Sequence, residues 1–233
     1  MNKKKIISIV AVVVLIAVAF VGMSLAYFTD TTEEATNVFT MGKVDITLQE
    51  HPVDDDGKQI KGSDLQAEGE GNEYHLFPGV PVDKDPTVTV LKGSEDCYVR
   101  MKVTLDNASV FYEIYKAKYG EQADMTAAIG SVLDYFIGYD SDKWITTADG
   151  YERDATNDTI TVTFNYFEMV EAPTDDAGTE LDPIITGVML PEWVTGEMAA
   201  KFEDGFSVTV VAEAIQAAGF EDADAAWTAF DAD

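Results

Sequence analysis

Two histidines, His51 and His75, are the first residues to test for metal-dependent chemistry. A zinc peptidase of the helical type needs two histidines one helical turn apart and a glutamate that acts as general base. His51 and His75 lie far apart in the chain, and neither a His-Glu-x-x-His motif nor a Gly-x-Ser-x-Gly nucleophile elbow is present. We therefore predict no catalytic residues and no enzyme activity. The alternative is a site built from both histidines and a distant carboxylate.

Acidic residues form four short clusters that could supply calcium with carboxylate oxygens. They are Asp54-Asp55-Asp56, Asp140 with Asp142, Asp175-Asp176, and Asp222 with Asp224. None fits an EF-hand, because the first and last positions of a loop around Gly57 fall on Pro52 and Ser63. Solvated acidic loops are the commoner use of such clusters. We predict no metal site and no cofactor, with weak calcium binding as the alternative.

The single cysteine, Cys97, excludes an internal disulfide. Cys97 alternates with apolar residues and has no histidine close to it in the sequence. This pattern predicts a small, buried hydrophobic side chain on a strand. An intermolecular disulfide or a reactive thiol is the alternative.

The N-terminal segment of the chain has the pattern of a secretory signal. Three lysines at 3–5 precede an apolar run at 6–21, and the small residues Ser24 and Ala26 follow it. A basic start, an apolar helix and a small-residue cleavage site are typical of a signal peptide. We predict a signal peptide at 1–26, and the cleavage residues are Ser24, Ala26 and Tyr27.

A retained membrane anchor is the alternative to cleavage, because residues 6–26 are long enough to cross a bilayer and the lysines fit the positive-inside rule. We favour cleavage, so that the protein contacts the membrane only before processing. Removing residues 1–26 takes away three lysines and no acid, which changes the formal net charge from −28 to −31. Such a surface repels nucleic acids and anionic lipids and favours cations, basic partners and solubility.

Period-two alternation of apolar and polar residues predicts six strands, each with one buried face. They lie at 44–48, 87–90, 97–105, 160–166, 184–190 and 206–214. Apolar residues at helical spacing predict helices at 108–119, at 125–136 and after Asp222, which can cap the last one. Residues 51–73 read as an exposed acidic loop. We expect a mostly β fold, an antiparallel β-sandwich with inserted helices, as one domain over 27–233.

Five short motifs carry a resemblance to a known family. They are Tyr27-Phe28-Thr29-Asp30, Phe39-Thr40-Met41-Gly42-Lys43-Val44-Asp45, Leu76-Phe77-Pro78-Gly79, Lys84-Asp85-Pro86 and Cys97-Tyr98-Val99-Arg100. Over about 3–105, and again at 206–216, the chain resembles the TasA/camelysin (CalY) family. These are exported proteins of Gram-positive bacteria that are processed by a SipW-type signal peptidase. Several of them assemble into biofilm matrix fibres, and some carry a metallopeptidase label.

The resemblance implies a jelly-roll arrangement, secretion to the extracellular matrix or cell surface, and partners that include the signal peptidase, other matrix proteins and the protein itself. We hypothesise that cleavage frees 27–42 as a donor strand, which adds to a free sheet edge of another copy and grows an open homopolymer. The candidate assembly residues are Tyr27, Phe28, Val38 and Phe39. The alternatives are a tail that folds back or stays loose, a camelysin-like secreted metallopeptidase, and a monomeric binding module of the cell surface.

Overall fold

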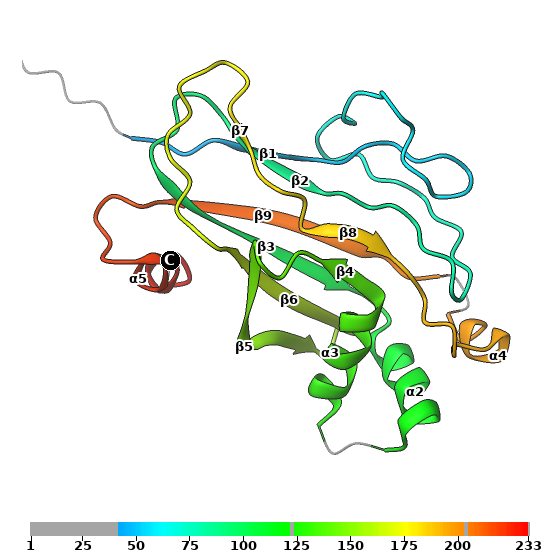
Figure 1. Ribbon diagram of the computed structural model, residues 1–233. Helices are drawn as coiled ribbons and strands as arrows, with labels where there is room; N and C mark the ends of the chain where they lie inside the picture. Colours follow the sequence, from blue (N-terminus) through cyan, green and yellow to red (C-terminus); the bar gives the residue numbers. More distant parts are fainter. Residues whose placement is uncertain (1–41, 122–123, 203–204, 233) are drawn as a thin grey trace, which may run out of the picture. The chain divides into compact units, whose positions relative to one another are not determined.

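Alternating apolar and polar residues fold into antiparallel sheets that pack against each other in a sandwich (Figure 1). The computed structural model describes residues 42–121, 124–202 and 205–232. Contacts group Gly42–Asp233 into one compact unit. The predicted signal, its cleavage residues and the donor segment fall within 1–41, so Ser24, Ala26, Tyr27, Phe28, Val38 and Phe39 lie outside the described residues.

Nine strands form three sheets among the described residues. The four-stranded sheet has the order β5 (Trp144–Asp154), β6 (Thr159–Tyr166), β3 (Cys97–Leu105) and β9 (Val208–Gln216). The three-stranded sheet has the order β1 (Ile46–Gln49), β2 (Thr87–Val90) and β7 (Thr179–Glu180). The two-stranded sheet pairs β4 (Ile137–Tyr139) with β8 (Ile185–Val188).

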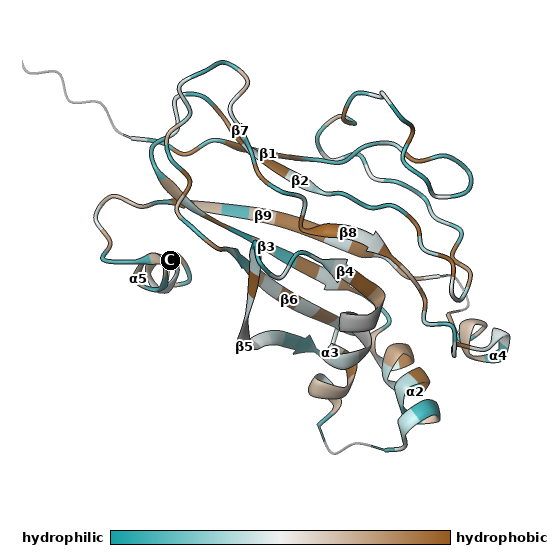
Figure 2. Cartoon of the chain, viewed as in Figure 1, coloured by the Kyte–Doolittle hydropathy of each residue, from teal (hydrophilic) through white to brown (hydrophobic). Residues whose placement is uncertain are grey.

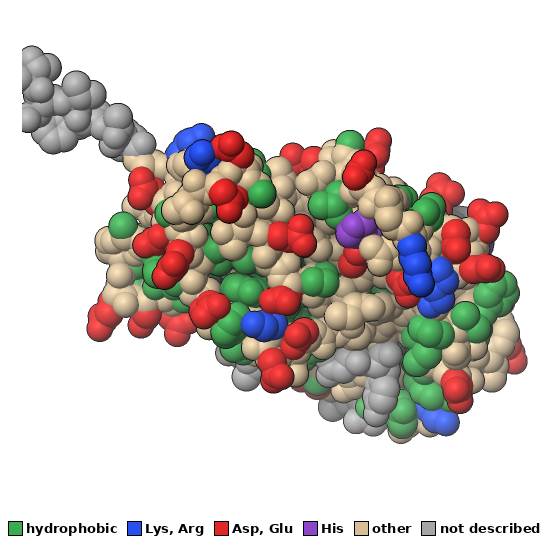
Figure 3. Space-filling model, turned by 45° about the horizontal axis from the view of Figure 1, so that its top comes forward, with side chains coloured by type: hydrophobic (Ala, Val, Ile, Leu, Met, Phe, Trp, Pro, Cys, Tyr) green, Lys and Arg blue, Asp and Glu red, His purple; other side chains and the backbone are tan. Residues whose placement is uncertain are grey.

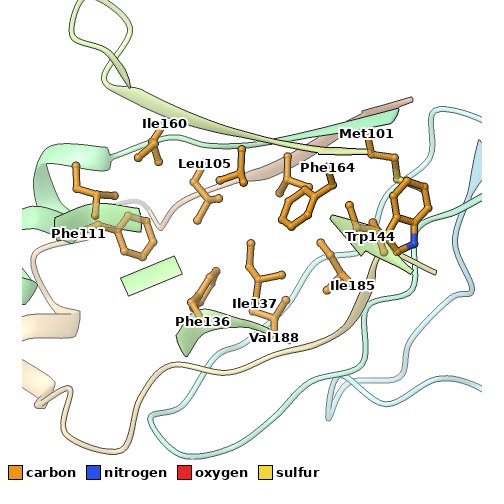
Figure 4. Packing of buried hydrophobic residues seen from close by; sticks show 14 of the residues in the cluster. Met101, Leu105, Phe111, Phe136, Ile137, Trp144, Ile160, Phe164, Ile185 and Val188 are labelled. Carbon is orange, nitrogen blue, oxygen red and sulfur yellow. The ribbon is translucent and has the colours of Figure 1, made fainter. Parts of the chain in front are cut away.

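The core lies between the four-stranded sheet and the sheets that face it. The five inward side chains of β3 are at most 1% exposed, namely Cys97, Val99, Met101, Val103 and Leu105. Figure 4 shows Met101, Leu105 and Phe164 pointing toward Ile137, Ile185 and Val188 of the two-stranded sheet. In Figure 2 the apolar residues follow the strands, while the connecting loops are largely hydrophilic. Burial of these apolar faces is the main force that holds the sheets together.

Two helices inserted between β3 and β4, α2 (Ala108–Tyr119) and α3 (Met125–Phe136), cover one end of the core. Phe111 of α2 meets Phe136 of α3 edge-on, with ring centroids 5.7 Å apart. Phe202 and Phe206 complete this aromatic cluster at 4.9 Å and 5.3 Å from Phe111. Edge-to-face rings add stability beyond the area that they bury.

The last helix, α5 (Ala223–Phe230), is held on the outer face of the four-stranded sheet by Arg100 of β3. The guanidinium lies 4.3 Å from the ring centre of Trp227 and 5.1 Å from that of Phe230. It donates a 2.6 Å hydrogen bond to Glu213 and two hydrogen bonds to Asp231. Arg100 is therefore only 4% exposed, although it belongs to the polar face of its strand.

The predicted fold class is confirmed, and the predicted helices at 108–119 and 125–136 match α2 and α3. Asp222 caps α5 as expected, because its carboxylate accepts a 2.9 Å hydrogen bond from the Ala225 amide. The six predicted strands appear with ends shifted by up to two residues. The alternation did not predict β4, β5 and β7, nor the short α4 (Gly196–Ala199).

Three side chains are placed differently from the sequence prediction. Thr186 is exposed while Ile185 is buried, because the pairing of β8 with β4 shifts at a bulge and reverses the faces there. Met125, one of the apolar residues at helical spacing in 125–136, is 41% exposed at the first turn of α3. Arg100, which alternates with the apolar residues of 97–105, is buried beneath α5.

The segment 51–73 contains neither a helix nor a named strand, and most of it is exposed as predicted. Its base is nevertheless fixed: the Gln66 amide donates to the Glu50 carbonyl, and the Asn72 side chain donates to the His51 carbonyl. Within the described ranges, no helix combines the length and the apolar composition that crossing a membrane requires.

Candidate assembly site

Two strands of the sandwich, β1 and β9, each have one edge without a strand partner among the described residues. They belong to different sheets, and their Cα atoms come within 8 Å of each other. Their inward side chains are only half-buried, unlike those of β3. These half-buried residues are Val44, Ile46, Leu48, Val208, Val210, Ala212 and Ala214. This open side of the sandwich exposes both apolar surface and unpaired strand edge, which are the two features that an added strand uses.

The open side widens into a cavity of about 560 Å³ where β9 begins. One wall carries apolar side chains from several segments that are distant in the sequence, namely Leu76, Val188, Leu190, Ala199, Phe202, Phe206 and Val208. The other end is polar, with Asn72, Tyr74, His75 and Lys84. Cavities of this size, mostly apolar and with a few polar groups, are typical of binding sites.

A buried ion pair forms the polar end of the cavity. Lys84 Nζ lies 2.8 Å from Glu50 Oε2, and both side chains are less than 10% exposed. Beside this pair, burial and then the negative charge of Glu50 raise the pKa of Tyr74. The Tyr74 hydroxyl is buried and has no hydrogen-bond partner of ordinary geometry, although the Asn72 side chain approaches it. The polar end therefore contains a buried hydroxyl without a hydrogen bond of ordinary geometry.

Exposed aromatic and aliphatic side chains lie on the segments beside the cavity. Phe77 is 64% exposed and Val80 is 46% exposed, on the turn that follows the cavity residue Leu76. Gly79 closes this turn at φ +77° and donates a 2.8 Å hydrogen bond to the Leu190 carbonyl. This positive φ favours glycine at position 79, and a Cβ there would also have to displace the Glu192 side chain, whose Cγ would lie 2.9 Å away.

The described chain begins at the opposite end of β9 from the cavity. In the pairing of β9 with β3, Val208 lies opposite Leu105 and Gln216 lies opposite Cys97. The turn just before β3 holds the chain start, because the Glu95 amide donates a 2.9 Å hydrogen bond to the Lys43 carbonyl. The eight residue steps from Val208 to Gln216, at about 3.3 Å each, separate the two ends by roughly 26 Å.

The residues that the sequence singled out for chemistry do not converge on one site. His51 Nδ1 lies 2.7 Å from Asp85 Oδ2, whereas His75 lines the cavity. Cys97 is fully buried as predicted, and burial raises the pKa of its thiol to about 11. A thiol with such a pKa is a weak nucleophile at neutral pH.

The acidic clusters serve local backbone turns. Asp54 accepts hydrogen bonds from the Asp56 and Lys58 amides, and Asp140 accepts one from the Asp142 amide. Asp175 accepts from two amides in the same manner, and Asp222 caps α5. No group of three potential metal ligands occurs in the part of the chain that the structure describes. Acidic side chains are instead spread over the face drawn in Figure 3.

Comparison of the chain with protein-family models, with curated proteins and with solved structures finds no match in any of the three. Sequence reasoning proposed a free edge but did not find the cavity. Phe206 and Val208 already belonged to a predicted strand, but nothing local indicated that Leu76 and Phe202 would lie beside them.

Proposed function

We propose that this protein is a secreted structural protein of the cell surface or extracellular matrix that assembles with copies of itself. Its processed N-terminal segment, 27–42, adds to the open side of another copy. The observation that carries the proposal is the cavity at the edge of β9, about 26 Å from the end where the chain enters the domain. A donor and an acceptor at opposite ends of one body give head-to-tail contacts, which grow an open filament instead of a closed dimer.

Three further features support the proposal. The segment 1–26 has the pattern of a cleavable signal, and the motifs around Tyr27 and Phe39 resemble an exported family with fibre-forming members. The half-buried apolar face of β9 provides the surface that an added strand would cover. The proposal assigns the SipW-type signal peptidase and other matrix proteins as partners, and it needs no catalytic residue and no cofactor.

Purification of two chains tests this proposal. The chain that starts at Tyr27 should form filaments, seen by electron microscopy and light scattering, while the chain that starts at Gly42 should stay monomeric because it lacks the donor. Circular dichroism should show the same β content for both. Filaments from both chains would exclude donation by the tail. A stable monomer from both, at high concentration, would favour the binding-module alternative.

A further inference from the structure

We infer that the Phe39 side chain of one copy occupies the cavity of a neighbouring copy and anchors the donated segment there. This inference depends on the proposed function, because it names the part of the donor that the acceptor holds. The lining of the cavity includes the apolar side chains of Leu76, Phe202 and Phe206. A single buried aromatic side chain is a strong anchor, because it removes a large apolar area from water at little conformational cost.

Chain length excludes the Phe39 of the same copy as the occupant. Phe39 precedes Gly42 by three residues, which span about 10 Å when fully extended. The cavity lies roughly 26 Å along β9 from the end where Gly42 enters the domain. Phe39 therefore falls short of the cavity in its own chain, whereas the Phe39 of a copy stacked on the cavity end reaches it.

The order of side-chain sizes in the tail matches the surface that it would cover. The strands β1 and β9 lie close together, with Cα atoms within 8 Å of each other. On an extended strand, the side chains that share a face with Phe39 are Asn37 and Ala35, both of which are smaller. Tyr27 and Phe28 are neighbours in sequence, so their side chains point to opposite faces of an extended strand. Only one of these two side chains could therefore enter the cavity.

The direction of the donated strand follows from the same geometry. In this arrangement, Gly42 of the neighbouring copy lies outside the domain, next to the Val208 end of β9. From Gly42 toward lower residue numbers, the neighbour's tail runs along β9 toward Gln216. The tail is therefore antiparallel to β9, and a donated strand can form regular antiparallel hydrogen bonds with the free edge near Val208.

Cysteine cross-linking tests the inference in the chain that starts at Tyr27. In Phe39→Cys/Val208→Cys, oxidation during assembly should join successive copies, giving a ladder of covalent oligomers on a denaturing gel. Val38→Cys/Val208→Cys is the matched control, because residue 38 points to the opposite face, and its ladder should be several times weaker. The native Cys97 does not interfere, because it is fully buried.

Alanine variants give a second, independent measurement. Phe39→Ala should raise the critical concentration for assembly at least tenfold, as truncation of a buried anchor does, while Val38→Ala should change it less than about threefold. A cross-linked monomer in place of the ladder would overturn the inference, because the tail would then occupy its own cavity. Normal filaments from Phe39→Ala would overturn the anchor but leave strand donation standing. Failure of the unmodified chain to form filaments would instead contradict the proposed function.

Discussion

The strands β3 and β9 lie side by side in one sheet, yet their surroundings differ sharply. β3 is paired on both edges, and its inward face is fully covered by the core. Within the described part of the chain, β9 is paired on one edge only, and its inward face is half-buried. Val103 and Val210 occupy the same row of the sheet, opposite each other, and Val103 is fully buried whereas Val210 is not.

This difference separates two tasks within one sheet. The closed side around β3 supplies stability, because its apolar side chains and its one arginine are fully enclosed. Among the described residues, the open side along β9 has half-buried apolar side chains and a strand edge without a strand partner, an arrangement that natural proteins usually avoid unless a partner covers it. The proposed assembly gives this open side its missing partner.

The largest expected effect is on the closed side, at Arg100. Arg100→Ala should lower the free energy of unfolding by about 3 kcal/mol, because it removes a buried cation, leaves Asp231 without its partner and leaves Glu213 with Lys102 alone. Trp227 and Phe230 also lose the guanidinium that packs against them. Urea denaturation of the chain that starts at Tyr27 measures the change.

Asp231→Asn provides the control for Arg100. The Asp231 side chain is 55% exposed, so its loss should cost about 1 kcal/mol or less. Arg100 lowers the pKa of Asp231 through hydrogen bonds, so this stabilisation is present above the usual pKa of an aspartate and fades as the pH falls through the lowered value. Equal losses in the two variants would contradict the enclosed role that we assign to Arg100.

A smaller loss of stability, measured at two paired valines, compares the closed side with the open side. Val103→Ala should cost about 2 kcal/mol, from the lost transfer energy of the methyl groups and the cavity that remains. Val210→Ala removes the same atoms from the same row but should cost about 1 kcal/mol in the monomer, because part of that side chain is already in water. Urea denaturation of unassembled protein checks both values.

Equal costs at the two valines would mean that the open side is as well packed as the closed one. If Val210→Ala also weakens assembly while Val103→Ala leaves it unchanged, the open side is the surface that the donated strand covers. The matched pair therefore tests the comparison and the proposed assembly with the same two variants.

The closed side could be predicted from sequence to a large extent. The alternation over 97–105 gives the correct buried face of β3, because a strand with one covered face needs that period. β5 was missed because Gly150 and an irregular register between Thr146 and Tyr151 interrupt its alternation. The burial of Arg100 could not be foreseen, because it depends on a helix that follows more than one hundred residues later.

The open side could not be located from sequence for a different reason. Alternation is a local signal, whereas the position of a strand at the edge or centre of its sheet depends on strand order. The pattern of β9 resembles that of β3, and only the assembled sheet shows that one edge of β9 has no strand partner in 42–121, 124–202 and 205–232. The cavity likewise combines residues from before β2 and after α4, which no local pattern connects.

The smallest expected effect lies in the cavity, at Tyr74. Tyr74→Phe should raise the free energy of unfolding by about 1 kcal/mol, because the buried hydroxyl is removed from water without a hydrogen bond in return. Thermal denaturation of the chain that starts at Tyr27 measures the change. Tyr98→Phe is the control, because Tyr98 lies on the polar face of β3, and this variant should have little effect on stability.

Assembly adds a second measurement at the same residue. If the ring of Phe39 fills the apolar part of the cavity, Tyr74→Phe should leave the critical concentration unchanged or lower it, since the cavity becomes more apolar. A Tyr74→Phe variant that is stable but assembles poorly would show that the hydroxyl bonds to the donated segment. The anchor would then be a polar contact at the Tyr74 end of the cavity, and the open side would recognise its partner by hydrogen bonding more than by apolar burial.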